Sequence, residues 1–223
     1  MTGTSINKIN FVFEDGKIYG LLGRNGAGKT TLFNCLNEDL NIDSGSFYLE
    51  DKNNKQKIES KDIGYVLSTP VVPDFLTGRE FLKFFLEINK DKIHNKKTLE
   101  EYFDMVHIEE EDRDLLLKDY SHGMKNKMQM LVNIISNPKI MLLDEPLTSF
   151  DVVVAEEIEG ILKNNKKNHI LIFSTHIMEL ALSLCDEMVL LNNGVLTKVD
   201  KEKLNNEELR KKIINILKGE ENA

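Results

Sequence analysis

The stretch "GLLGRNGAGKTTLFNCL", residues 20–36, places a glycine-rich turn between an apolar run and the start of a helical pattern. The segment from Gly23 to Thr30 fits the spacing G-x-x-x-x-G-K-[ST]. Glycine permits positive φ, so the amide groups of such a turn and of the helix that follows it can face one anion. The stretch therefore predicts a loop that holds the phosphates of a nucleotide.

Each polar residue of this loop has an expected partner on the nucleotide. Lys29 would place its ammonium group between the β- and γ-phosphates, Thr30 would bind Mg²⁺, and Thr31 would contact an α-phosphate oxygen. The residues expected to contact the nucleotide in this loop are Gly23, Arg24, Asn25, Gly26, Ala27, Gly28, Lys29, Thr30 and Thr31.

The phosphate loop alone does not identify the reaction, because kinases, GTPases and ATPases all use such a loop. Motifs in the second half of the chain distinguish among these classes. Residues 139–146, KIMLLDEP, indicate a buried strand that ends in two adjacent carboxylates. Asp144 is expected to hold Mg²⁺ through water, and Glu145 to polarise the attacking water. His176 follows another apolar run, ILIFST, and is expected at the same sheet edge in contact with the γ-phosphate.

Composition limits the classes of protein that are possible. The chain has 223 residues, 41% hydrophobic and 30% charged, with a formal net charge of −8, which argues against a protein that wraps nucleic acid. No apolar run reaches the length of a membrane span, and the first residues do not form a signal peptide, so a cytoplasmic location is expected. Cys35 and Cys185 are expected to be free thiols.

Apolar runs alternate with helical patterns at both ends of the chain, as in a parallel α/β core. Residues 9–13, INFVF, are one of the apolar runs expected in that core, and residues 47–58 indicate a hairpin with an Asn-Asn turn at its rim. The tail, residues 201–219, has apolar residues at helical spacing and predicts a helix that closes the core.

Residues 71–137 show helix signals and no strong strand signal. Thr77 with Glu80, and Thr98 with Glu101, fit the capping box that begins a helix. The run FLKFFLEI after the first box is apolar nearly all round, so we expect it to be packed inside a helical lobe.

Together these motifs resemble the nucleotide-binding subunit of ABC transporters, and the likeness covers essentially the whole chain. It includes the phosphate loop, the signature segment YSHGMKNK at residues 120–127, Asp144, the segment SFD that ends at Asp151, and His176. The resemblance implies an α/β P-loop fold of the ABC ATPase type, with a parallel sheet, an antiparallel β edge and an inserted helical lobe. Residues 1–70 and 138–223 would form the nucleotide-binding core, and residues 71–137 the helical subdomain.

The resemblance also implies a head-to-tail dimer in which the signature of one subunit faces the ATP bound by the other. Ser121 would offer a hydroxyl, His122 and Gly123 would lie beside the nucleotide, and a helix from about Lys125 would point its positive end at the γ-phosphate. Asp151 is expected among the nucleotide-binding residues by the same resemblance.

Three features depart from the family pattern. The usual signature L-S-G-G-Q is replaced by residues 120–124, YSHGM, a form similar to that of exporters with separate permeases. Ser68 occupies the position of the glutamine that touches Mg²⁺, and reaches the metal only if its loop moves inward or a water bridges the gap. The aromatic residue that usually stacks on adenine would fall just before Met1, so base stacking must come from elsewhere or be lost.

The expected function is ATP hydrolysis with Mg²⁺ in a bacterial ABC exporter of a peptide or drug-like compound. A membrane permease on another chain and a second ATPase subunit are the expected partners, with no nucleic acid, so the chain would sit on the inner face of the membrane. The region from Pro70 to Phe85 would dock the permease. The alternative is a subunit that binds ATP, hydrolyses it weakly and works beside an active paralogue. A DNA- or ribosome-directed ATPase lacks support because no second cassette, long coiled coil or basic arm is seen, and a GTPase because no N-K-x-D motif follows the loop.

Overall fold

The computed structural model describes residues 6, 9–51, 54–91, 93, 97–147, 152–205 and 207–220. These residues form a six-stranded sheet in the order β4-β5-β6-β1-β7-β8 and a separate pair, β2-β3. All neighbours in the large sheet are parallel except β7 and β8, which are antiparallel. Its strands are β1 (Lys17–Leu22), β4 (Ile63–Val66), β5 (Ile140–Leu143), β6 (Ile170–Thr175), β7 (Glu187–Asn192) and β8 (Val195–Val199).

Both faces of the sheet are covered, because the central strands β1, β5 and β6 are mostly apolar and are buried at every position after Lys17. Helix α1 (Lys29–Leu36) packs on one face through Leu32 and Phe33, beside Leu142 and Ile172. On the opposite face, Leu143 and other strand residues belong to a second apolar cluster. The helices that contribute to this cluster include α4 (His122–Ser136), α5 (Val152–Asn165), α6 (Met178–Leu184) and α7 (Glu207–Lys218).

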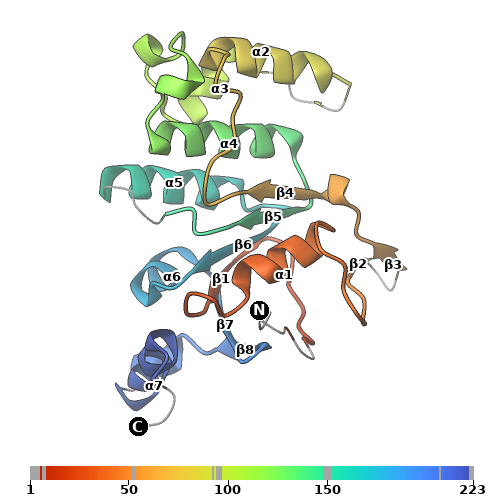
Figure 1. The fold of residues 1–223 in the computed structure, drawn as a ribbon, viewed down its shortest axis with the longest axis vertical. Helices are drawn as coiled ribbons and strands as arrows, with labels where there is room; N and C mark the ends of the chain where they lie inside the picture. The colour runs from red at the N-terminus through yellow and green to blue at the C-terminus, as the bar shows by residue number, and fades with distance from the viewer. Residues whose placement is uncertain are drawn as a thin grey trace.

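The region between β4 and β5 is helical in its described residues, with α2 (Gly78–Ile88), α3 (Leu99–Met105) and α4. Both predicted capping boxes are present: Thr77 with Glu80 begins α2, and Thr98 with Glu101 begins α3. Figure 1 shows α2 and α3 lying beyond α4, on the side of α4 away from the sheet. None of the described helices is long and apolar enough to cross a membrane.

Several smaller predictions are confirmed. The hairpin exists as β2 (Tyr48–Asp51) paired with β3 (Asn54–Lys57), although residues 52 and 53 of its turn lie outside the described residues. The tail forms α7, whose Ile213 is buried in the core. Cys35 and Cys185 are free thiols, and burial raises the pKa of Cys185 to about 11.

Residues 9–13 pack against the core as expected, although they form no strand: Phe11 and Phe13 lie edge-on to the ring of Tyr19. Two expectations are wrong. The helix of the signature segment begins at His122 rather than near Lys125, because Ser121 already caps it. The run FLKFFLEI is not enclosed, since Phe84 and Ile88 are 57% and 61% exposed and only one side of α2 packs inward.

Helix α4 is joined to the sheet at a close approach that a glycine makes possible. A Cβ atom at Gly64 in β4 would lie 2.6 Å from Asn133 Oδ1 and 2.8 Å from Pro138 Cγ. We expect Gly64→Ala to lower the free energy of unfolding by about 1–3 kcal/mol, because the added methyl group overpacks this contact. The measurement is urea unfolding followed by circular dichroism.

Gly160 in α5 is the matched control, because a Cβ atom there would meet nothing within 4 Å. Alanine in a helix interior is better than glycine by about 0.5–1 kcal/mol, so Gly160→Ala should raise the free energy of unfolding. Equal effects of the two substitutions would contradict the proposed packing of α4 on β4.

Candidate functional site

The candidate residues meet at one edge of the sheet because β1, β5 and β6 are parallel neighbours that end together. Gly23 follows β1, Asp144 follows β5, and His176 follows β6. The chain is still tied to the sheet at these ends: Gly23 N donates to Thr175 O at 3.3 Å, and Asp144 N donates to Val66 O at 2.9 Å. Ligands of open α/β sheets bind outside the carboxyl ends of the strands, which is where these residues lie.

The phosphate loop connects β1 to α1 through two residues in the left-handed region. Gly26 has φ +80 and Gly28 φ +104, a conformation that disfavours residues with a Cβ atom. Gly23 is needed for a different reason, since a Cβ atom there would lie 3.0 Å from Leu191 O. The loop therefore has the backbone form that the sequence predicts for a phosphate cradle.

Lys29 is the buried cation of this loop. Its Nζ donates to Gly23 O at 2.9 Å and Arg24 O at 3.3 Å, and lies 3.3 Å from Glu145 Oε1. These contacts hold the ammonium group inside the loop, next to a carboxylate from β5. A cation in this position can neutralise a phosphate that the loop binds.

Asp144 is a buried carboxylate with a hydroxyl group on each oxygen. Thr30 Oγ1 donates to Asp144 Oδ2 at 2.8 Å, and Ser174 Oγ donates to Asp144 Oδ1 at 2.6 Å. Carboxylate and hydroxyl oxygens are the donors that Mg²⁺ prefers, and Mg²⁺ binds to few protein groups while keeping waters and phosphate oxygens. Thr30 and Asp144 thus fit the metal site predicted for them.

Glu145 has a positive φ angle, and its carboxylate lies between the ammonium group of Lys29 and the imidazole of His176. Its φ is +48, a conformation that costs a residue other than glycine roughly 1–2 kcal/mol. Its carboxylate lies 3.3 Å from Lys29 Nζ, through Oε1, and 3.3 Å from His176 Nδ1, through Oε2. Glu145 is only partly buried, so solvent water reaches the carboxylate.

The remaining predicted residues lie apart from this cluster or outside the described residues. Ser68 is exposed and lies two residues beyond the end of β4. Ser121 caps α4 by accepting a hydrogen bond from Met124 N at 3.2 Å, with His122 and Gly123 in the first turn. Asp151 lies outside the described residues.

Ser174 is the residue of this cluster that sequence reasoning missed. It bonds Asp144 as described, and its Oγ accepts a hydrogen bond from Glu145 N at 2.9 Å. The available signal was a hydroxyl in the otherwise apolar run that precedes Thr175 and His176. A serine buried in such a run needs hydrogen-bond partners.

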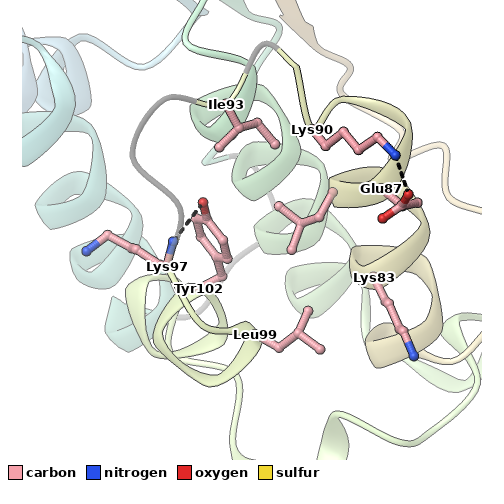
Figure 2. Close-up of a pocket in the computed structure, with 8 residues that line it drawn as sticks. Lys83, Glu87, Lys90, Ile93, Lys97, Leu99 and Tyr102 are labelled. Carbon is pink, nitrogen blue, oxygen red and sulfur yellow. Dashed lines mark hydrogen bonds and ion pairs between the residues drawn. The ribbon is translucent and has the colours of Figure 1, made fainter.

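A cavity of about 250 Å³ lies between α2 and α3, and Figure 2 shows the side chains that line it. Its apolar residues include Leu86, Ile93, Leu99 and Tyr102, and lysines 83, 90 and 97 stand around them. Lys90 is paired with Glu87 at 2.8 Å. None of the predicted nucleotide-binding residues lines this cavity, so it is separate from the candidate site.

The family model for the ABC transporter matches residues 6–148. The chain belongs to the ABC transporter family. The bacitracin transport ATP-binding protein BcrA of Enterococcus faecalis is 32% identical over 213 residues, which cover 94% of this chain and 67% of that protein. The uncharacterized ABC transporter ATP-binding protein YxlF of Bacillus subtilis is 29% identical over 86% of this chain and 64% of its own length.

Solved structures agree on the architecture. An ATP-binding subunit of an ABC transporter superposes with a TM-score of 0.72 at 20% identity, over 92% of this chain and 91% of that one. A dimeric ATP-binding cassette, MJ0796, bound to ADP and phosphate, superposes with a TM-score of 0.68 at 21% identity, over 86% and 89% of the two chains. At these identities the likeness shows the fold, and the predicted ABC ATPase fold with its mostly parallel sheet and antiparallel edge is confirmed.

Proposed function

We propose that this ABC transporter subunit hydrolyses ATP in a dimer and thereby drives a membrane permease carried on another chain. The observation that carries the proposal is the cluster at the sheet edge, where Lys29, Asp144, Glu145 and His176 are brought together from three strand ends. Each of these groups has a chemical use in phosphoryl transfer to water.

The phosphate loop would bind and orient the triphosphate. Lys29 would exchange its contact with Glu145 for the β- and γ-phosphates, and the backbone amides of the loop would surround the remaining charge. Mg²⁺, held through Thr30 and Asp144, would neutralise charge on the phosphate oxygens.

Glu145 would act on the attacking water. Glu145 is only partly buried, and the contact of its carboxylate with His176 restricts where it can point. We assign Glu145 as the group that orients the water and accepts its proton, and His176 as the group that contacts the γ-phosphate from β6. Proton transfer to a positioned side chain contributes typically 10²- to 10⁴-fold to a rate, on the order of 3–5 kcal/mol.

The dimer is proposed because the signature segment presents a hydroxyl group and an imidazole at the protein surface. Ser121 and His122 are exposed at the start of α4, a helix of 15 residues whose N-terminus favours an anion. A head-to-tail pair would bring this segment to the γ-phosphate held by the partner subunit. Residues 1–70 and 138–223 are proposed as the nucleotide-binding core, and residues 71–137 as the helical subdomain.

The permease would dock on apolar side chains of the region from Pro70 to Phe85, together with Ile88 of α2. Val71 and Phe75 are exposed in the segment before α2, and Phe84 and Ile88 are exposed one turn apart on α2 itself. We take these exposed apolar side chains along one segment of the chain as the basis for an interaction site. This contact would hold the subunit at the inner face of a bacterial membrane. The proposed cargo is an exported peptide or drug-like compound; one relative of this chain is a bacitracin transport ATP-binding protein.

One observation favours the alternative of a weakly hydrolysing subunit that pairs with an active paralogue. Ser68, at the position of the family's metal-contacting glutamine, is exposed and has a short side chain. The two possibilities differ in whether the purified chain alone turns ATP over.

A mixing experiment tests the head-to-tail dimer. We expect Glu145→Gln to lose hydrolysis through loss of the base, and Gly123→Asp to lose it because a carboxylate would face the partner's phosphates. Mixed in equal amounts, they should recover roughly a quarter of the wild-type rate, since half of the dimers are mixed and one of the two sites in each is intact. The measurement is phosphate release with Mg²⁺ after mixing.

Each variant assayed alone at the same total concentration is the control. Absence of any recovery on mixing would show that the signature acts on the nucleotide of its own chain, and full activity of Gly123→Asp assayed alone would show that the signature has no role.

The docking surface is tested by Phe84→Ser, which removes an exposed aromatic side chain. We expect the variant to leave the membrane fraction of cells that make the permease, while its ATPase rate in solution stays within about twofold of wild type. Val195→Ser, which removes an exposed apolar side chain from β8, is the matched control and should remain with the membranes. Equal retention of both variants would exclude Phe84 from the docking surface.

A further inference from the structure

We infer that Ser174 is a positioning residue that sets both the metal-binding carboxylate of Asp144 and the backbone of Glu145. The inference deepens the proposed function and rests on it for the roles of these two acids. Ser174 is 0% exposed, in a strand in the middle of the sheet. A hydroxyl in that environment must find hydrogen-bond partners within the protein.

The two partners of Ser174 are the two adjacent acids. Its O–H donates to Asp144 Oδ1 at 2.6 Å, and its oxygen accepts from Glu145 N at 2.9 Å. Strand register explains the contact: β5 and β6 pair in parallel with Leu143 opposite Phe173, so the next residues along both strands lie side by side. Ser174 also shares its face with Ile170 and Ile172, which pack on the α1 side of the sheet.

The bond to Glu145 N bears on the strained backbone of that residue. Glu145 has φ +48, and such a conformation persists only where its surroundings fix it. The hydrogen bond from its amide to Ser174 is one such constraint, and it determines the direction in which the Glu145 side chain leaves the strand. That direction brings the carboxylate to Lys29 and His176.

The bond to Asp144 fixes the other carboxylate. With Thr30 on Oδ2 and Ser174 on Oδ1, the plane of the Asp144 carboxylate is held from both sides. Groups that orient a metal ligand affect metal affinity by about 10- to 100-fold when they are removed. One serine of β6 thus connects the metal ligand to the residue assigned as the base.

The test compares Ser174→Ala with Ser174→Thr, which keeps the hydroxyl, and with Thr175→Val. The last variant removes a buried hydroxyl from the other face of the same strand, where Thr175 Oγ1 accepts from Ile177 N at 3.0 Å. If Ser174→Ala does not fold, Ser174→Cys replaces it, because a thiol keeps the size but bonds weakly. Thermal melting of each variant measures how much the substitution lowers stability, which is then compared with its effect on Mg²⁺ binding.

The decisive readout is ADP affinity with and without Mg²⁺, which does not depend on turnover. We expect Ser174→Ala to reduce the gain in ADP affinity that Mg²⁺ gives by about tenfold, while ADP affinity without Mg²⁺ stays within about twofold. Ser174→Thr should restore most of the gain, and Thr175→Val should leave it unchanged. A Ser174→Ala protein that melts earlier but keeps the full Mg²⁺ effect would overturn the inference.

Kinetics test the link to Glu145. With Mg²⁺ at a saturating concentration, Ser174→Ala should still lower kcat about ten- to a hundredfold with little change in KM, because the backbone of Glu145 loses its hydrogen bond. A kcat that returns to the wild-type value at saturating Mg²⁺ would contradict action through Glu145. If the wild-type chain itself does not hydrolyse ATP, the proposed function fails, and the ADP measurement alone still decides the role of Ser174.

Discussion

The parallel pairing of β1, β5 and β6 is the constraint on which the rest of the site depends. Parallel neighbouring strands end at the same edge of a sheet, so the residues that follow them lie close together although they are far apart in sequence. Gly23 begins the phosphate loop there, Asp144 and Glu145 extend from β5, and His176 extends from β6. A change that shifted one of these strands by a residue would separate Thr30 from Asp144.

At this edge the chain combines positive and negative groups that contact one another. Lys29 is held by two carbonyl oxygens and by Glu145, while Asp144 is held by two hydroxyl groups. Buried charges without such partners would be costly. The same groups are those that a magnesium-bound triphosphate requires, so the arrangement is already organised for binding.

The sequence predicted much of this fold because its strongest signals are local. The phosphate loop follows from glycines at fixed spacing, and the starts of α2 and α3 follow from capping boxes. The exposure of Phe84 was missed because a helix that is apolar on most sides does not reveal which side packs. Ser174 was missed for a related reason: its partners come from a neighbouring strand, and no spacing in the sequence encodes them. For Ser121 and Gly123, the proposed partner is a second chain.

The central claim is that the chain hydrolyses ATP at sites completed by a second copy. The most direct measurement is the rate of Mg²⁺-dependent phosphate release per chain, taken over a wide range of protein concentration with Glu145→Gln as the blank. We expect a rate per chain that rises with concentration toward a plateau and is lost in the variant. A rate per chain that is independent of concentration at all dilutions, or that survives in Glu145→Gln, would contradict this claim.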